Sequence, residues 1–239
     1  MEKGSLPRHI ALIMDGNGRW AKKRLMPRVM GHRQGKNTLK ALIQHCGRLG
    51  IEILTVYAFS SENWQRPDEE VSFLMKLFLE SLQEELREMH HNGMRVNFIG
   101  DVSVFSTALQ EIMAKAEALT AKNQGMIFNI AVNYGARAEI LRAAKEVVSE
   151  IEAGCLDLAQ LSEAQFEQFL YTKGLPDPDL LIRTSGESRI SNFLLWQCAY
   201  TELYFTDTLF PDFKPAQLDQ ALEWYAGRER RYGKISEQI

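Results

Sequence analysis

Cysteine is scarce in this chain, and long apolar runs are missing. Its three cysteines, Cys46, Cys155 and Cys198, lie far apart and show neither a CxxC pair nor metal-site spacing. We therefore expect reduced core thiols. The apolar stretch nearest the start, residues 10–14, ends at Asp15 and is too short for a signal peptide or a membrane span. These absences predict a cytoplasmic protein and leave room for peripheral contact with the inner face of a membrane.

The chain also lacks a strong excess of either charge. Its 239 residues include 28 Lys and Arg against 31 Asp and Glu, a net charge of −3 that gives no general attraction to nucleic acid. A hydrophobic content of 45% fits one ordinary domain with a substantial core. Because no Gly-, Pro- or Ser-rich linker divides the chain, we expect a single domain over residues 1–239, and partners must be inferred from local sites.

Three familiar phosphate-handling motifs are absent. There is no G-x-x-x-x-G-K-S/T sequence, and the loop after the first expected strand has only two of the three glycines of the dinucleotide fingerprint. The D-x-D pattern of phosphatases with an aspartate nucleophile is missing as well, because Asn17 stands where the second aspartate is needed. Neither a P-loop nucleotide, nor NAD, nor that phosphatase chemistry is expected.

Short apolar runs alternate with longer segments of helical periodicity, which predicts an α/β fold with a mostly parallel central sheet flanked by helices. The expected strands are Ile10–Met14, Ile51–Phe59, Val96–Ile99, Met126–Val132, Leu180–Ile182 and Leu203–Phe205. The expected helices are Gly31–Leu49, Pro67–His91, Ser106–Ala121, Arg137–Ala153, Ser162–Tyr171 and Pro215–Arg228. Gly50 and Gly93 stand where helix-ending glycines belong.

Polar loops follow four of these strands, at residues 15–20, 60–64, 133–135 and 183–187. The carboxyl ends of parallel strands converge at one edge of a sheet, where ligands bind. We therefore expect one site built from all four loops.

The first loop suits a metal–diphosphate group. Gly16 and Gly18 allow close backbone approach, Arg19 offers a fixed-charge fork, and Asp15 offers a hard oxygen ligand for magnesium. The alternative is a tight turn in which Asp15 only caps the following helix.

The basic residues nearest these loops favour oxyanion binding, because arginine forks bind phosphate bidentately. Each of them alone also fits a surface position or a surface ion pair. They are Arg28, His32, Arg66, Arg183 and Arg189.

The helix over residues 67–91 is apolar almost all round for two turns. This pattern fits a core helix that also forms a subunit interface. The alternative is one wall of an apolar tunnel between the sheet and two helices, whose other wall would carry Leu39, Leu42, Ile43 and Cys46.

Several blocks resemble the conserved blocks of the cis-prenyltransferases, in order and at similar spacing, and within that family most resemble bacterial undecaprenyl diphosphate synthases. They are residues 9–21 (HIALIMDGNGRWA), 31–32, 59–64 with 66–67, 133–135, 181–187, 189–197 and 202–205. The resemblance implies a magnesium-dependent transferase that condenses isopentenyl diphosphate onto farnesyl diphosphate with cis double bonds. Its product would be undecaprenyl diphosphate, a lipid carrier precursor for cell-wall synthesis.

The resemblance also implies roles for single residues. Asp15 would hold magnesium and the allylic diphosphate, with Glu202 as a second metal carboxylate, and Asn63 would take part in proton removal. A carboxamide is a poor base, so we expect Asn63 to position or relay while a diphosphate oxygen or water takes the proton. The allylic diphosphate would contact Gly16, Asn17, Gly18, Arg19, Trp20, Arg28 and His32. Isopentenyl diphosphate would contact Arg183, Arg189, Ile190 and Ser191, and the loop between the substrates would comprise Ser60, Ser61, Glu62, Trp64 and Arg66.

One local departure and two alternatives remain. Many cis-prenyltransferases carry a histidine where this chain has Ser188, a weak metal ligand. A trans-prenyltransferase would need aspartate-rich motifs, and this chain has no adjacent aspartates. A catalytically silent lipid-binding subunit of a cis-prenyltransferase complex would be expected to lose Asp15, Asn63 or the Arg183/Arg189 pair. The resemblance further implies a homodimer, with the basic tail at residues 228–233 near its interface. Taken alone, this tail also fits a solvated helix end.

Overall fold

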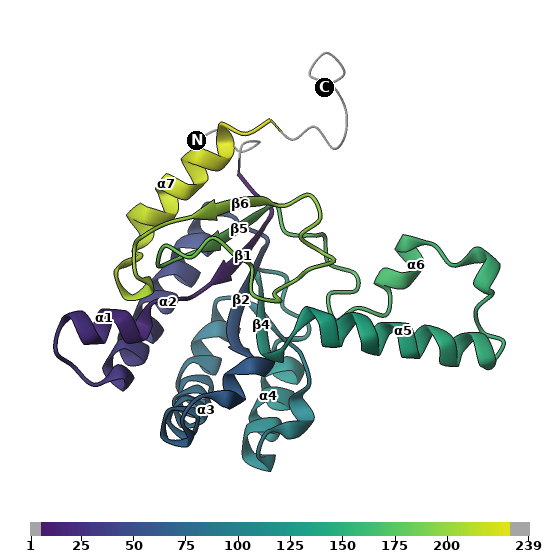
Figure 1. The fold of residues 1–239 in the computed structure, drawn as a ribbon, viewed down its shortest axis with the longest axis horizontal. Coiled ribbons are helices and arrows are strands. Elements are labelled where there is room, and N and C mark those ends of the chain that lie inside the picture. Colours follow the sequence, from purple (N-terminus) through teal and green to yellow (C-terminus); the bar gives the residue numbers. More distant parts are fainter. Residues whose placement is uncertain (1–5, 230–239) are drawn as a thin grey trace. The chain divides into compact units, whose positions relative to one another are not determined.

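A computed structural model describes residues 6–229 of the chain (Figure 1). The chain divides into two compact units, and each is described by itself. The first comprises the described parts of Met1–Thr55, Pro178–Arg189 and Gln197–Ile239, and the second comprises Val56–Asp177 and Ile190–Trp196. One of the points where the chain passes between the units, Thr55 to Val56, falls inside a strand, and the prediction of a single domain stays a prediction.

Every predicted strand is present, and the paired strands run parallel. The strands are β1 His9–Ile13, β2 Ile53–Ser60, β3 Arg95–Ile99, β4 Ile127–Tyr134, β5 Leu180–Arg183 and β6 Glu202–Phe205, in the sheet order β3-β4-β2-β1-β5-β6. The pairs β1 with β5, β5 with β6 and β3 with β4 are parallel. The predicted α/β class with a mostly parallel sheet flanked by helices is therefore confirmed.

The first unit contains three helices beside β1, β5 and β6. They are α1 Asn17–Lys23, α2 Arg28–Leu49 and α7 Pro215–Ala226. Helix α1 was not predicted, because a short segment that opens Asn-Gly has little intrinsic helix propensity. Helix α2 begins at Arg28, directly after Pro27, and not at Gly31 as expected. Gly50 ends α2 in a left-handed conformation, as predicted. Helix α7 ends two residues early, where Gly227 donates to helix carbonyls.

In the second unit, α3 Asp68–His91 and α4 Thr107–Thr120 lie side by side near β3 and β4. Helix α5 Ala136–Glu152 follows β4 and contacts α6 Glu163–Glu167. The short 3-10 helices are η1 Ser61–Gln65, η2 Val102–Val104 and η3 Leu158–Gln160 here, and η4 Phe210–Asp212 in the first unit.

Helix α6 is shorter than the predicted span 162–171, and side chains of α5 explain the difference. Arg142 donates to the Phe169 carbonyl, and Glu139 accepts from the Tyr171 N–H. Backbone groups that a continued helix would pair internally are thus bound from outside, so the segment turns instead.

The apolar band of α3 is only partly covered. Val71, Leu82 and Leu86 are buried. The apolar side chains of the band between residues 73 and 79 are half-buried, namely Phe73, Leu74, Met75, Leu77, Phe78 and Leu79. In α2, Leu42, Ile43 and Cys46 are buried. An apolar tunnel bounded by these helices stays a prediction.

The prediction of core thiols holds for one cysteine only. All three are free, but Cys155 is exposed and Cys198 is partly exposed. Cys46 is buried, and burial raises the pKa of its thiol to about 12. Cys155 follows the end of α5, where its N–H returns to the Glu150 carbonyl in a surface turn. Within residues 6–229, no helix combines the length and the apolarity needed to cross a bilayer.

Candidate functional site

The turn after β1 is built on a glycine. Gly16 has φ 103°, and a Cβ there would lie 2.9 Å from both the Ser185 Cβ and the Leu209 Cδ2. Only glycine fits that conformation and space. Gly16 is also the N-cap of α1, so the Asp15 side chain does not occupy the capping position and is directed elsewhere.

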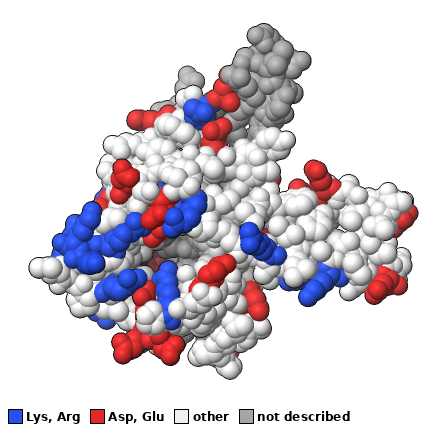
Figure 2. Space-filling view, in the orientation of Figure 1, with Lys and Arg blue, Asp and Glu red and all other residues white. Residues whose placement is uncertain are grey.

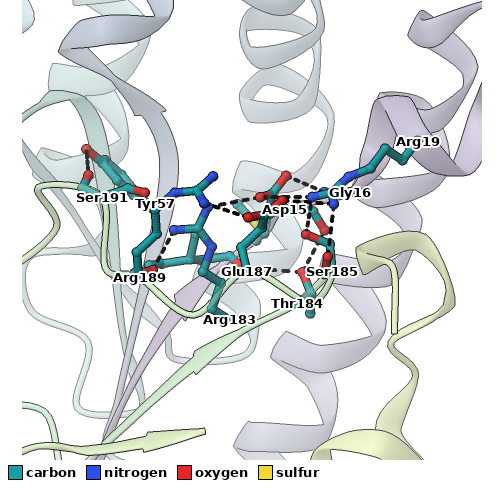
Figure 3. Close-up of polar contacts among 12 residues, drawn as sticks. Asp15, Gly16, Arg19, Tyr57, Arg183, Thr184, Ser185, Glu187, Arg189 and Ser191 are labelled. Carbon is teal, nitrogen blue, oxygen red and sulfur yellow. Dashed lines mark hydrogen bonds and ion pairs between the residues drawn. The ribbon is translucent and has the colours of Figure 1, made fainter. Parts of the chain in front are cut away.

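The Asp15 carboxylate binds two arginines (Figure 3). Its Oδ2 lies 3.0 Å from Arg183 Nη2 and 3.2 Å from Arg19 Nη2, and its Oδ1 accepts from the Gly16 N–H at 2.6 Å. Burial by itself raises the pKa of Asp15, but the hydrogen bond from Arg183 and the charges of Arg183 and Arg19 lower it more, so the pKa lies below its ordinary value. Asp15 is therefore an ionised hard-oxygen group.

The loop after β5 supplies further charge next to this turn. Thr184 Oγ1 donates to the Asp15 carbonyl at 2.7 Å, which ties the two loops together. Glu187 accepts from Arg19 at 3.1 Å and from Arg189 at 2.5 Å. Arg183 is nearly fully buried and also donates to the Arg189 carbonyl at 2.5 Å. Three guanidinium groups and two carboxylates thus gather at the carboxyl ends of β1 and β5.

Helix α2 packs closely on the start of α1 because two of its residues are glycines. A Cβ at Gly31 would lie 1.9 Å from the Asn17 carbonyl oxygen, and one at Gly35 would lie 2.3 Å from Asn17 Oδ1. The Arg28 guanidinium lies against Gly18, where a Cβ would meet its Cζ at 3.0 Å. Asn17, Gly18 and Arg28 are thus brought together with the Asp15 turn. His32 is half-buried on α2, next to Gly31 in sequence.

Trp20 lies on α1 and is tied to η4. Its Nε1 donates to Asp212 Oδ1 at 2.7 Å, and the Arg24 guanidinium sits over its ring at 4.1 Å. This fixes the ring, while its predicted contact with the allylic diphosphate stays a prediction.

Glu202 is not brought to Asp15 within the chain. In the register of β1, β5 and β6, Ile10, Leu180 and Glu202 are level, so Glu202 starts β6 at the end of the strands opposite to Asp15. Its carboxylate pairs with Arg228 at 3.3 Å. Glu202 therefore does not lie beside Asp15 within a single copy of the chain, and its role as a second carboxylate at the metal stays a prediction. Among residues 6–229, no group of three His, Cys, Asp or Glu side chains could hold a metal ion.

In the second unit, the loop after β2 is held by a capping box at η1. The Ser60 N–H donates to Asn63 Oδ1 at 3.1 Å, and the Ser60 side chain accepts from the Asn63 backbone. Trp64 Nε1 donates to Asn133 Oδ1 at 2.8 Å, and Asn133 Nδ2 donates to the Asp101 carbonyl at 2.9 Å. The loops after β2 and β4 are thereby joined through side chains.

In the second unit, Asn192 contacts both the loop after β2 and the start of α5. Asn192 Nδ2 donates to Glu62 at 2.8 Å, and its Oδ1 accepts the Arg137 N–H at the start of α5. Burial by itself raises the pKa of Glu62, but this hydrogen bond helps to lower it below its ordinary value. Gly135 leaves room for these side chains, because a Cβ there would lie 2.7 Å from Ser61 Oγ and 2.8 Å from Asn192 Nδ2 and would displace them.

Ser191 and Arg66 also lie in the second unit. The Ser191 carbonyl accepts from Tyr57 at 3.4 Å (Figure 3), next to the half-buried Ile190. Arg66 forms an ion pair with Glu70 at 3.1 Å, which agrees with the alternative of a surface ion pair given for the arginines.

Asn192 and Tyr57 contribute contacts that were not predicted from the sequence. Asn192 stood inside a block already singled out, and its positive φ of 61° marks a position where asparagine is favoured. Nothing in the local pattern around Tyr57 signals its contacts, because they join distant parts of the chain.

Comparison with known proteins decides the family. The family described as “Putative undecaprenyl diphosphate synthase” matches residues 13–233. The chain belongs to this family. A ditrans,polycis-undecaprenyl-diphosphate synthase ((2E,6E)-farnesyl-diphosphate specific) of Legionella pneumophila (strain Paris) is 52% identical over 97% of this chain and 98% of its own length.

Solved structures agree with membership of the undecaprenyl diphosphate synthase family. Lavandulyl diphosphate synthase from Lavandula x intermedia, in complex with dimethylallyl diphosphate, has a TM-score of 0.93 and 41% identity over 97% of this chain and 100% of that one. A probable undecaprenyl diphosphate synthase from Campylobacter jejuni has a TM-score of 0.79 and 36% identity over 95% and 99%. The resemblance to cis-prenyltransferases read from the sequence is therefore confirmed.

Proposed function

We propose that this chain condenses isopentenyl diphosphate units onto farnesyl diphosphate, with cis double bonds, to make undecaprenyl diphosphate for cell-wall synthesis. Membership of the undecaprenyl diphosphate synthase family supports the reaction class. The proposed active site rests on one observation: the ionised Asp15 carboxylate is held between Arg183 and Arg19 at the end of β1. Guanidinium forks are suited to bind diphosphate oxygens, and a lone carboxylate among them is suited to bind a metal.

The first unit binds diphosphate in this proposal. Backbone N–H groups at the start of α1 point toward the turn, where the helix dipole favours negative charge. Arg19 and Arg28 contact the allylic diphosphate together with Gly16, Asn17, Gly18 and His32, while Trp20 flanks it. Arg183 and Arg189 contact isopentenyl diphosphate. Arg19, Arg183 and Arg189 each exchange a present carboxylate or carbonyl partner for a phosphate oxygen.

The residues present fit magnesium. Mg²⁺ is usually held by one or two carboxylates together with substrate phosphates and water, so Asp15 alone is a sufficient protein ligand. When bound, the ion supplies positive charge that stabilises the departing diphosphate. Glu202 is not included as a ligand within one chain, and Ser188, which is exposed, is not needed for this site.

Asn63 orders the loop in this proposal and does not accept the proton. Its Oδ1, the only basic atom of the carboxamide, already accepts the Ser60 N–H. A diphosphate oxygen or a water takes the proton instead. The remaining loop side chains, Ser60, Ser61, Glu62, Trp64 and Arg66, belong to the loop between the two substrates, and Ile190 and Ser191 contact isopentenyl diphosphate.

The experiment is incubation of the purified chain with radiolabelled isopentenyl diphosphate, farnesyl diphosphate and Mg²⁺, with product length read by chromatography. We expect a ladder that ends at the undecaprenyl length, and its loss with a chelator or in Asp15→Ala. A homodimer is part of the proposal and is measured by light scattering of the same sample. A folded chain that makes no product with any allylic starter would instead favour a silent lipid-binding subunit.

A further inference from the structure

The segment that joins α1 to α2 exposes basic and apolar side chains together. Residues 22–28 are all exposed. The surrounding stretch 16–51 holds nine Lys and Arg residues and no Asp or Glu, in a chain whose net charge is −3. Figure 2 shows Lys and Arg side chains gathered over α1, with uncharged residues, drawn in white, at its outer end. We call Lys22, Lys23, Leu25, Met26 and Met30 the α1–α2 tip.

Leu25 occupies a position where folding alone favours glycine. It is left-handed, with φ 55°, and follows the C-cap residue Arg24. The Leu25 N–H donates to the Lys22 carbonyl at 3.1 Å and the Met26 N–H to the Ala21 carbonyl at 3.0 Å, the two bonds of a Schellman motif. A leucine in this conformation is strained relative to glycine.

No packing offsets that strain. Leu25 is 97% exposed, more than any other large hydrophobic residue in the described part of the chain, and Met26 and Met30 are 44% and 39% exposed. Three apolar side chains therefore face water within six residues. This grouping is what a surface that enters an apolar phase requires.

The lysines of the tip carry uncompensated charge. Neither Lys22 nor Lys23 makes an ion pair with any residue in the range 6–229. Arg24 differs, because it pairs with Asp212 at 3.2 Å and stacks on Trp20. The tip thus presents two free ammonium groups beside its apolar side chains, and Asp212 is already neutralised by Arg24.

The tip is one short helix away from the Asp15 turn. Helix α1 starts next to Gly16 and ends at the tip, and its seven residues span about 10 Å. Arg28, which opens α2 directly after the tip, returns its guanidinium to Gly18. A group bound at the tip would therefore lie near the diphosphate turn.

We propose that the α1–α2 tip binds the surface of a membrane that contains anionic phospholipids. Leu25, Met26 and Met30 enter the headgroup region, and Lys22 and Lys23 contact lipid phosphates. Charge complementarity selects anionic lipid, and exposed leucine and methionine distinguish this surface from a nucleic-acid interface, where apolar side chains at the phosphates gain nothing.

The test is flotation of the full-length chain with vesicles of phosphatidylcholine, alone or mixed three to one with phosphatidylglycerol. We expect binding to the mixed vesicles that weakens with salt, and little binding to phosphatidylcholine. The double variant Lys22→Glu/Lys23→Glu should bind at least about 30-fold more weakly. Leu25→Gly should bind about tenfold more weakly, although its thermal midpoint rises by about 2 °C because the strain is relieved.

Matched variants change the same charge or side chain elsewhere. Lys115→Glu/Lys122→Glu alters two exposed lysines on and after α4, and Leu158→Gly removes an exposed leucine. Both should float like the unaltered chain.

The proposal is overturned if the unaltered chain stays unbound with the mixed vesicles, if the α4 lysine variant loses as much binding, or if Leu25→Gly binds normally. Vesicle binding needs no substrate, so this proposal and the proposed synthase reaction can fail independently.

Discussion

Replacing Asp15 by asparagine should strengthen metal-free diphosphate binding while it abolishes most of the turnover. The Asp15 carboxylate lies 3.0 Å from Arg183 and 3.2 Å from Arg19, the guanidinium groups that a diphosphate would use. Without a metal, the carboxylate therefore competes with the ligand for both arginines and repels it. Asparagine keeps the size of the side chain and removes the charge.

The magnitude follows from the charges. Two like unit charges 5 Å apart repel by about 3 kcal/mol at an effective dielectric constant near 20. The Asp15 side chain is 33% exposed, and salt screens it, so about 1–2 kcal/mol of repulsion is relieved. Metal-free diphosphate should thus bind roughly 5- to 30-fold more tightly. Turnover with magnesium should fall by about 100-fold or more, because the metal loses its carboxylate.

The assay is isothermal titration of the variant and the unaltered chain with inorganic diphosphate in EDTA, followed by turnover with Mg²⁺. Asp157→Asn is the matched control, because Asp157 is an exposed cap of η3, and it should leave both quantities unchanged. Thermal melting monitors folding, since the nearly buried Arg183 loses a partner and about 1–3 kcal/mol of stability is expected to go. A folded Asp15→Asn variant that binds metal-free diphosphate no more tightly than the unaltered chain would refute the reasoning.

Three further outcomes are expected. Asn63→Asp should keep most of the turnover, because its oxygen still accepts the Ser60 N–H, whereas Asn63→Ala should lose it; radiolabelled product formation checks this. Tyr134→Phe should lower the free energy of unfolding by about 1.5–3 kcal/mol in urea titrations, since the buried Glu139 carboxylate loses a donor at 2.5 Å. Partial burial and the neighbouring Glu167 carboxylate raise the pKa of Asp177 to about 6, so this group costs stability as pH rises from about 4 to 6. Asp177→Asn should therefore stabilise by about 1 kcal/mol at pH 8, a small effect because solvent still reaches the side chain and screens its charge, and not at pH 3.5.

Each of these has a contrary result. Equal losses in both Asn63 variants would mean that its Nδ2 group acts directly. An unchanged urea midpoint in Tyr134→Phe would mean that water replaces the hydroxyl at Glu139. A gain for Asp177→Asn that is the same at both pH values would show that the carboxyl titrates normally in the folded chain.

Local sequence patterns were sufficient for the strands and for part of the site. Short apolar runs between the helical segments identified all six strands, because the strands of a buried parallel sheet are continuously apolar. The loops after β1 and β5 meet, as strand direction required, which brings Asp15 and Arg183 together. Gly16 predicted a turn with close backbone approach, and the structure has no room for a side chain there. These features depend on residues close in sequence or on the direction of parallel strands alone.

Tertiary structure decided what depends on register and on distant partners. The register of β6 moved Glu202 to the opposite end of the strands from Asp15, which no local pattern records. The occupied Oδ1 of Asn63 and the bond from Asn192 to Glu62 arise from side chains that meet only after folding. By itself, the sequence determined the family, the sheet and the chemistry of the loops, since these depend on residue type and order. Which charges meet was decided by packing, because a hydrogen bond requires atoms within about 3 Å, and only the folded chain sets that distance.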